Sequence, residues 1–185
     1  MNPLFLVGLT IGAYFAYRFA TSEDAPINPV LSSDCRNNAL GDGTDWKSLV
    51  NDNFKNAVET SRVTQVPAAL LLALGIHETR MRDLQGRAGE QGYLQILPKT
   101  KDMLRAKYKI LENKNPRKLP DAFYFAAYHL LDTSRTLGVA IDSPTNITAY
   151  NTGATAARTL EGNTCYAQAV VPLYRTINQY FFYSL

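Results

Sequence analysis

The residues from Ala68 to Ile76 form an apolar run along their whole length. On a helix, such a run is hydrophobic on every face, and a helix of that kind is stable only inside a domain core. Pro67 stands directly before the run, where proline suits the first turn of a helix. The sequence therefore predicts a buried central helix from Pro67 to the region between Glu78 and Arg82, with the rest of the domain packed around it.

Glu78 lies close behind this apolar run. A carboxyl group at the end of a buried helix is costly to ionise, because loss of water disfavours the charged form and raises the pKa. A glutamic acid that keeps its proton near neutral pH can protonate a poor leaving group. The competing interpretation is an ordinary solvated glutamate at a helix end, and the apolar run by itself does not exclude it.

A segment with three glycines follows Glu78 and ends in the sequence Gly-Tyr-Leu-Gln-Ile-Leu-Pro at residues 92–98. Glycines let a backbone pass close to a ligand, and Pro98 suits the start of the next helix. We expect at most a short hairpin between Gly86 and Gln95.

Three short motifs resemble those of the lytic transglycosylase domain, which is related to goose-type lysozyme. They are Glu78-Thr79, residues 92–98 and Ala149-Tyr150-Asn151-Thr152-Gly153. The family writes them as Glu-Ser, Gly-Leu-Met-Gln-Ile-x-Pro and Ala-Tyr-Asn-x-Gly, in the same order and at similar spacing. The resemblance covers about residues 60 to 175 and departs from the family pattern at Thr79, Tyr93 and Leu94.

The resemblance implies an all-α, lysozyme-like fold with Glu78 as the catalytic acid. It further implies that Tyr150 faces the acid across a cleft, with its hydroxyl near Glu78 or the scissile oxygen, as a second catalytic residue. The implied substrate-binding residues are Thr79, Tyr93, Gln95 and Asn151. For Gln95, a buried structural amide is an equally good interpretation.

The reaction implied is cleavage of the β-1,4 bond between N-acetylmuramic acid and N-acetylglucosamine in peptidoglycan glycan strands, with formation of a 1,6-anhydro product. One carboxyl group suffices for it, as general acid and then base. Hydrolysis by a goose-type lysozyme is the first alternative. It needs a second carboxyl, which Asp83 or Glu90 could supply. The second alternative is a catalytically inactive module of the same fold that serves assembly.

We expect no cofactor, no metal and no nucleic acid. In a zinc-binding H-E-x-x-H motif starting at His77, the second histidine would fall on Met81, and the chain has two histidines and two cysteines in all. Between Arg80 and Lys118, eleven Lys and Arg residues face four Asp and Glu. Such a segment suits either an anionic polymer or an ordinary solvated surface, and no nucleic-acid-binding signature accompanies it.

Residues 3–20 carry one charge, Arg18, and as a helix would extend about 27 Å, close to the thickness of a bilayer core. No basic residues precede the run and no clean cleavage site follows it, which favours a retained transmembrane anchor over a signal peptide. Residues 21–44 are then a linker and residues 45–185 the lysozyme-like transglycosylase domain. The anchor implies a domain facing the periplasm or cell wall, in a phage virion or beside a secretion apparatus, whose proteins are further expected partners.

Local signals predict the remaining helices at residues 46–62, 98–111, 120–137, 144–151 and 163–180. Asp45 and Ser143 are expected caps, and Gly138 an expected helix end. The two cysteines, Cys35 and Cys165, are either a disulfide, if the domain lies in an oxidising compartment, or two isolated buried thiols.

Overall fold

The computed structural model describes residue 35 and residues 45–184. The chain divides into two compact units, Met1–Val30 and Leu31–Leu185, and all the described residues belong to the second. The expected anchor at residues 3–20 and nearly all of the expected linker at 21–44 lie outside the described residues. Within residues 45–184, no helix is both long and apolar enough to cross a membrane.

The described domain is mostly helical, as the sequence predicts. Its elements are, in chain order, α2 (Trp46–Thr64), α3 (Ala68–Thr79), β1 (Leu84–Gln85), β2 (Gln91–Gly92), α4 (Pro98–Lys107), the 3₁₀ turn η2 (Lys109–Leu111), α5 (Leu119–Leu137), α6 (Pro144–Thr152), α7 (Ala154–Leu160) and α8 (Cys165–Ser184).

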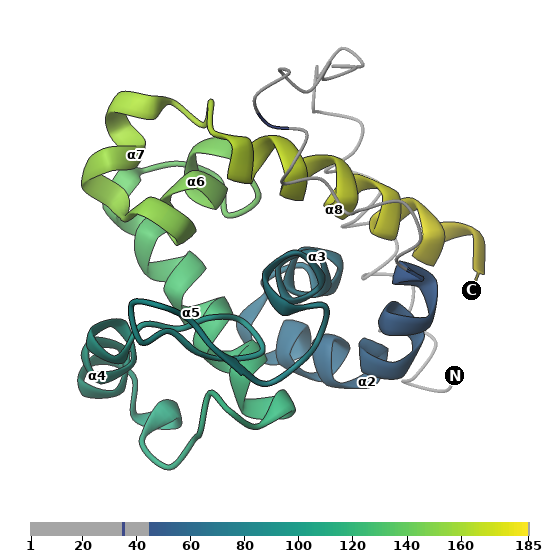
Figure 1. Ribbon diagram of the computed structural model, residues 1–185, viewed down its shortest axis with the longest axis horizontal. Coiled ribbons are helices and arrows are strands. Elements are labelled where there is room, and N and C mark those ends of the chain that lie inside the picture. Colours follow the sequence, from purple (N-terminus) through teal and green to yellow (C-terminus); the bar gives the residue numbers. More distant parts are fainter. Residues whose placement is uncertain (1–34, 36–44, 185) are drawn as a thin grey trace, which may run out of the picture. The chain divides into compact units, whose positions relative to one another are not determined.

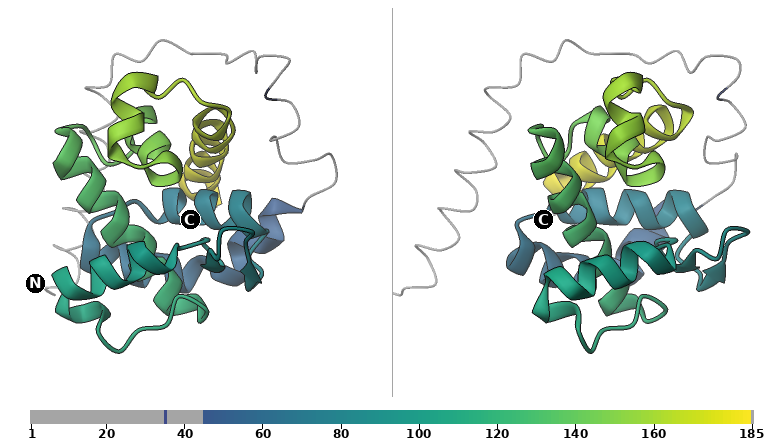
Figure 2. Two further views of the ribbon diagram at one scale, coloured as in Figure 1. Left: turned by 60° about the vertical axis from the view of Figure 1, so that its left-hand side comes forward. Right: turned by 90° about the vertical axis from the view of Figure 1, so that its left-hand side faces the viewer.

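Helix α3 is the centre of this domain. All its residues from Ala69 to Ile76 are buried, as expected for a helix that is hydrophobic on every face. Figure 1 shows α3 end-on, with α8 on one side and α2 on the other, and α3 contacts both helices. In the turned views of Figure 2, α6, α7 and α8 lie on one side of α3 and α4 lies on the opposite side.

Most helix ends follow the predicted local signals. The Asp45 carboxylate accepts a hydrogen bond from the Ser48 amide at 3.1 Å, and the Ser143 hydroxyl accepts one from the Asn146 amide at 3.1 Å. Gly138 ends α5 in the left-handed conformation. These contacts satisfy backbone groups that have no partner within the helix.

Two helices differ from the prediction. Helix α4 ends at Lys107 and not at Leu111, because Tyr108 adopts an extended backbone and its hydroxyl donates to Asp132 of α5. Helix α7 was not predicted. It is separated from α6 by Gly153, whose backbone angles of φ 83° and ψ 156° are accessible mainly to glycine.

Strands β1 and β2 form a short antiparallel hairpin, with Leu84 opposite Gly92. The sequence allowed at most such a hairpin, and β1 lies just before its expected start at Gly86. The hairpin is held against the loop that precedes α5. The Arg117 Nε donates to both carboxylate oxygens of Asp83, at 3.0 and 3.1 Å. A side chain at Gly92 would collide with the Pro116 carbonyl. Because glycine has no side chain, the hairpin can lie close to the backbone of this loop.

The two cysteines form a disulfide between Cys35 and Cys165. It joins residue 35 to the first residue of α8 across a sequence separation of 130 residues. The sequence left open a disulfide or two isolated buried thiols, and the structure shows the disulfide.

Candidate active site

The carboxyl group of Glu78 lies in the last turn of α3, half-buried, beside the first turn of α8. Its Oε1 atom accepts a hydrogen bond of 2.6 Å from the hydroxyl of Tyr166. The ring of His77 packs edge-on against the Tyr166 ring, with centroids 4.9 Å apart. The acid is therefore held at the junction of two helices that are far apart in sequence.

Burial raises the pKa of the Glu78 carboxyl to about 7. The hydrogen bond from Tyr166 opposes this rise, and the negative charge of Glu90 adds to it. Burial also raises the pKa of the Tyr166 hydroxyl well above its ordinary value, so Tyr166 remains a hydrogen-bond donor. The Glu78 carboxyl therefore keeps its proton to a higher pH than an exposed glutamate does.

The two oxygens of the Glu78 carboxyl have different surroundings. Oε1 accepts from Tyr166, whereas Oε2 has no hydrogen bond from residues 45–184 and is not among the fully buried polar atoms that lack a partner. In a protonated carboxyl group, the carbonyl oxygen is the stronger hydrogen-bond acceptor. The contact of Oε1 with Tyr166 therefore favours the acidic proton on Oε2, the oxygen that is open to a ligand.

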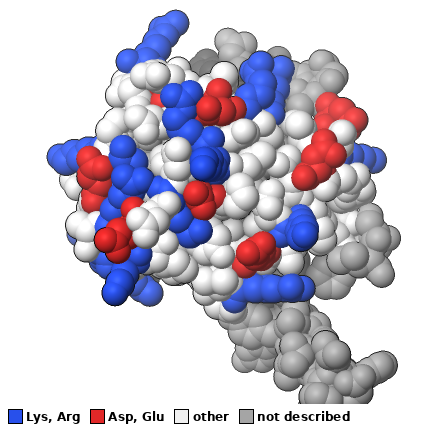
Figure 3. Space-filling model, turned by 90° about the horizontal axis from the view of Figure 1, so that it is seen from below, with Lys and Arg blue, Asp and Glu red and all other residues white. Residues whose placement is uncertain are grey.

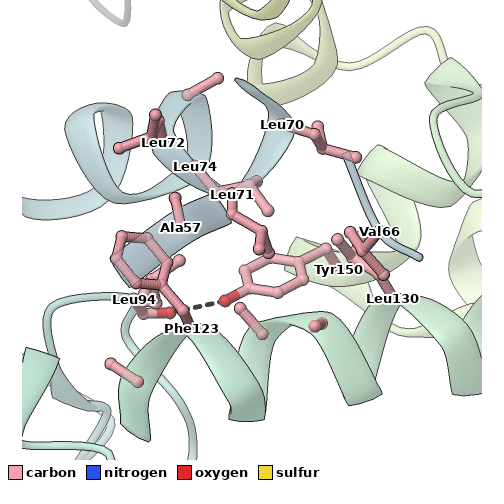
Figure 4. Packing of buried hydrophobic residues seen from close by; sticks show 14 of the residues in the cluster. Ala57, Val66, Leu70, Leu71, Leu72, Leu74, Leu94, Phe123, Leu130 and Tyr150 are labelled. Atoms are coloured by element: carbon pink, nitrogen blue, oxygen red, sulfur yellow. Dashed lines mark hydrogen bonds between the residues drawn. The ribbon is translucent and has the colours of Figure 1, made fainter. Parts of the chain in front are cut away.

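Tyr150 lies near Glu78, as expected: burial raises the pKa of its hydroxyl, and the charge of Glu78 adds to this rise. Its hydrogen bond, however, goes to another group. Its buried hydroxyl donates to the Leu94 carbonyl at 2.8 Å, as Figure 4 shows, and its ring lies among core side chains such as Leu71 and Leu130. The Leu94 carbonyl is buried just beyond the hairpin, where it needs a donor. The hydroxyl that contacts Glu78 is that of Tyr166, and Tyr150 instead holds the segment that follows β2.

Thr79 does not present its hydroxyl to a substrate. The side chain is 3% exposed, and its Oγ1 donates to the Tyr93 carbonyl at 2.8 Å and accepts from the Arg82 amide at 3.1 Å. The structure therefore does not support the predicted substrate contact. Instead, the Thr79 hydroxyl links the end of α3 to residues 92–98.

Gln95 braces the hairpin with its side-chain amide. Its Nε2 donates to the Gly92 carbonyl at 2.7 Å and to the Leu84 carbonyl at 3.2 Å, and its backbone is left-handed, with φ 49°. Its Oε1 lies next to Gly86. The sequence allowed two roles for Gln95, substrate binding or a structural amide. The two hydrogen bonds of the amide nitrogen favour the structural role.

The remaining predicted binding residues are more accessible. Tyr93 is half-buried and packs against the core, and Asn151 is exposed at the end of α6. Within the described part of the chain, the Asn151 side chain makes no hydrogen bond. Both side chains can therefore contact a ligand without first breaking a polar contact.

The two candidates for a second carboxyl differ. Asp83 is held by Arg117, whereas Glu90 is half-buried and its Oε2 accepts from the Ala88 amide at 2.9 Å. Of these two, Glu90 is the one whose charge acts on Glu78.

The basic segment from Arg80 to Lys118 is partly neutralised. Figure 3 shows Lys and Arg gathered on the face seen from below, with Asp and Glu between them. Four of the eleven basic side chains are in ion pairs, namely Lys101–Asp102, Lys107–Asp132, Lys114–Asp121 and Arg117–Asp83. These pairs favour the interpretation as a solvated surface.

Tyr166 is the site residue that the sequence analysis missed. It lies 88 residues beyond Glu78, and no local pattern connects the two. The one available signal was its position beside Cys165, at the start of the last predicted helix. No protein family and no curated protein matches the sequence.

Proposed function

We propose that this protein is a peptidoglycan lytic transglycosylase whose catalytic domain is lysozyme-like. The observation that carries the proposal is the Glu78 carboxyl, with a pKa raised by burial to about 7 and one oxygen bonded to Tyr166. An acid that is still protonated at neutral pH is what cleavage of a glycosidic bond requires. The three motifs that resemble the family support the substrate class.

In the proposed first step, the proton on Oε2 of Glu78 passes to the glycosidic oxygen between N-acetylmuramic acid and N-acetylglucosamine. The bond between C1 and that oxygen breaks, and N-acetylglucosamine leaves with a free 4-hydroxyl group. The N-acetyl carbonyl of the muramic residue stabilises the positive charge at C1. The Tyr166 hydroxyl, which donates to Oε1, stabilises the carboxylate that Glu78 has become.

In the second step, the Glu78 carboxylate accepts the proton of the muramic C6 hydroxyl. The C6 oxygen then bonds to C1 and closes the 1,6-anhydro ring, and the acid is restored for the next cycle. No water enters the reaction. Tyr93 and Asn151 are proposed to contact the glycan, because both are accessible, whereas Thr79, Gln95 and Tyr150 hold the acid and the hairpin.

Digestion of purified sacculi, with mass spectrometry of the released muropeptides, tests this function. We expect 1,6-anhydro ends from the wild type and no release from Glu78→Gln, with unchanged helical circular dichroism. Binding of sacculi by the wild type without any release would overturn the proposal and assign the chain an assembly role.

Hydrolysis is the second candidate, and Glu90 is the observation in its favour. The charge of Glu90 acts on Glu78, and a second carboxylate is what a hydrolase uses to activate water. Reducing ends in place of anhydro ends, lost again in Glu90→Gln, would identify the hydrolase. Asp83→Asn is the matched control, because the Asp83 carboxylate is already engaged by Arg117.

The proposed setting is a membrane-anchored enzyme that opens the cell wall for a phage virion or a secretion apparatus. Residues 3–20 would supply the anchor, with the catalytic domain on the periplasmic or cell-wall side. Membrane fractionation of the full chain, compared with a chain that lacks residues 1–20, tests the anchor. Recovery of both proteins in the supernatant contradicts it.

A further inference from the structure

Three consecutive residues, the one that precedes α8 and the first two of the helix, each make a contact with another part of the domain. The hydroxyls of Thr164 and Thr148 share a hydrogen bond of 3.0 Å, and Thr164 Oγ1 also accepts from the Ala167 amide at 3.2 Å. Cys165 is bonded to Cys35. Tyr166 donates to Glu78. The disulfide and the residue that contacts the acid are therefore neighbours in one helical turn.

Tyr166 is buried, and its hydroxyl reaches Glu78 from the first turn of α8. The 2.6 Å hydrogen bond and the edge-on contact with His77 both depend on the position of this turn. Cys35 is 3% exposed, so its end of the disulfide is buried. A bond between a buried residue and the helical turn limits how far that turn can move.

We propose that the Cys35–Cys165 disulfide positions the catalytic acid: it holds the Tyr166 hydroxyl on Glu78, and thiol–disulfide exchange thereby controls the site. This inference rests on the proposed function. Forming the bond removes two electrons and two protons from the two thiols, and a disulfide-containing oxidant accepts them by exchange. A dithiol reductant reverses the step and becomes a disulfide itself. The Tyr166 hydroxyl is thus held on Glu78 in oxidising compartments and is free to move away in reducing ones.

Four titratable groups face or adjoin the Glu78 carboxyl. They are Tyr166 from α8, Tyr150 from α6, Glu90 from the hairpin loop and His77 from α3. Among the causes that act on the pKa of Glu78, the Tyr166 hydrogen bond lowers it, whereas burial and Glu90 raise it. If the disulfide holds the Tyr166 hydrogen bond in place, reduction removes the cause that lowers the pKa of Glu78. Burial and Glu90, which raise it, remain.

The experiment uses the full chain in detergent, oxidised with glutathione disulfide or reduced with dithiothreitol. The ¹³C-labelled carboxyl of Glu78 is titrated by NMR and assigned by difference from Glu78→Gln, and muropeptide release is measured against pH. We expect reduction to raise the pKa of Glu78 by about one pH unit, as for loss of a hydrogen bond to a charged group. The carboxylate formed in the first step then lacks its hydrogen bond from Tyr166, so release at pH 7 should fall by up to about tenfold, although more of the acid is protonated.

Tyr166→Phe is the decisive control, because it lacks the hydroxyl that the disulfide is proposed to hold. Its titration and pH profile should be the same in oxidant and in reductant. The double variant Cys35→Ser, Cys165→Ser should behave like reduced wild type in both conditions. Circular dichroism at each redox state establishes that the domain is folded.

Three outcomes overturn the inference. In the first, reduction lowers the melting temperature but leaves the Glu78 titration unchanged, so the disulfide is structural only. In the second, Tyr166→Phe responds to reduction as strongly as the wild type. In the third, reduction unfolds the whole domain even at low temperature, so the disulfide supports the core and not the acid. The NMR titration tests the inference even if the oxidised protein releases no muropeptides. Absence of release would contradict the proposed function but not the effect of the disulfide on Glu78.

Discussion

Ionisation of the half-buried Glu78 carboxyl destabilises the folded protein. Its pKa is about 7 in the folded domain against an ordinary value of 4.5. The folded state therefore binds the proton more tightly than the unfolded state does. The stability that this proton contributes is complete below pH 4.5 and is lost as the pH rises through 7.

Glu78→Gln should therefore stabilise the protein at alkaline pH while abolishing release. At pH 9 we expect a free energy of unfolding about 2 kcal/mol above that of the wild type, a value discounted for the partial exposure of the side chain. At pH 4 the two proteins should be equally stable, because both then carry a neutral group. Urea unfolding at the two pH values measures the difference, and a wild type that is the more stable protein at pH 9 contradicts the assignment.

Tyr150 and Tyr166 are both buried and differ in what their hydroxyls contact, so their phenylalanine variants form a matched pair. Tyr166→Phe should shift the alkaline limb of the pH profile upward, because the bond that lowers the pKa of Glu78 is lost. It should also reduce release at pH 7 about tenfold. Tyr150→Phe should cost about 1 to 3 kcal/mol of stability, since the Leu94 carbonyl loses its donor.

Measured pH profiles of release and urea unfolding separate these two effects. The limb of Tyr150→Phe is expected to stay where the wild type has it. If the alkaline limb of Tyr150→Phe shifts as much as that of Tyr166→Phe, Tyr150 also acts on the Glu78 carboxyl.

At the level of elements, the hairpin depends on the absence of a side chain at Gly92. Its φ is +79°, and a Cβ there would collide with the Pro116 backbone. Gly138 is the comparison, because its φ is +71° and nothing lies within 4 Å of the position of a Cβ. The two glycines thus share the backbone conformation and differ in the space around them.

We expect Gly138→Ala to lower the free energy of unfolding by about 1 kcal/mol, the cost of a left-handed alanine. Gly92→Ala should lower it by about 3 kcal/mol, since backbone must also move, and should reduce release through the displaced hairpin. Urea unfolding of both variants is the measurement. Equal losses would show that the contact with Pro116 contributes nothing.

The elements themselves were largely predictable because their signals are local. The caps at Asp45 and Ser143 and the end at Gly138 depend on residues within a few positions of the helix end. The premature end of α4 was not predictable, since the extended backbone at Tyr108 accompanies a hydrogen bond to Asp132 on another helix. Helix α7 was not predictable because a glycine such as Gly153 is a local signal for the end of a helix, whereas here the next helix begins directly after it, at Ala154.

For the whole molecule, the disulfide is the longest covalent constraint. It closes a loop with a sequence separation of 130 residues, for which loop-closure entropy predicts about 5 kcal/mol as an upper value. We expect reduction to lower the free energy of unfolding by about 3 to 5 kcal/mol, within the total stability of an ordinary domain. Urea unfolding with and without dithiothreitol measures this loss, and identical midpoints would contradict it.

The sequence by itself determined what depends on neighbours along the chain: a buried central helix, an acid at its end and the helix caps. Only the tertiary structure decided which side chains meet there. Tyr166 reaches Glu78 across 88 residues, Tyr150 reaches Leu94 across 56, and Cys35 joins Cys165 across 130. The physical reason is that local patterns set the period and ends of a helix, whereas contacts between distant residues depend on how α6 and α8 pack around α3.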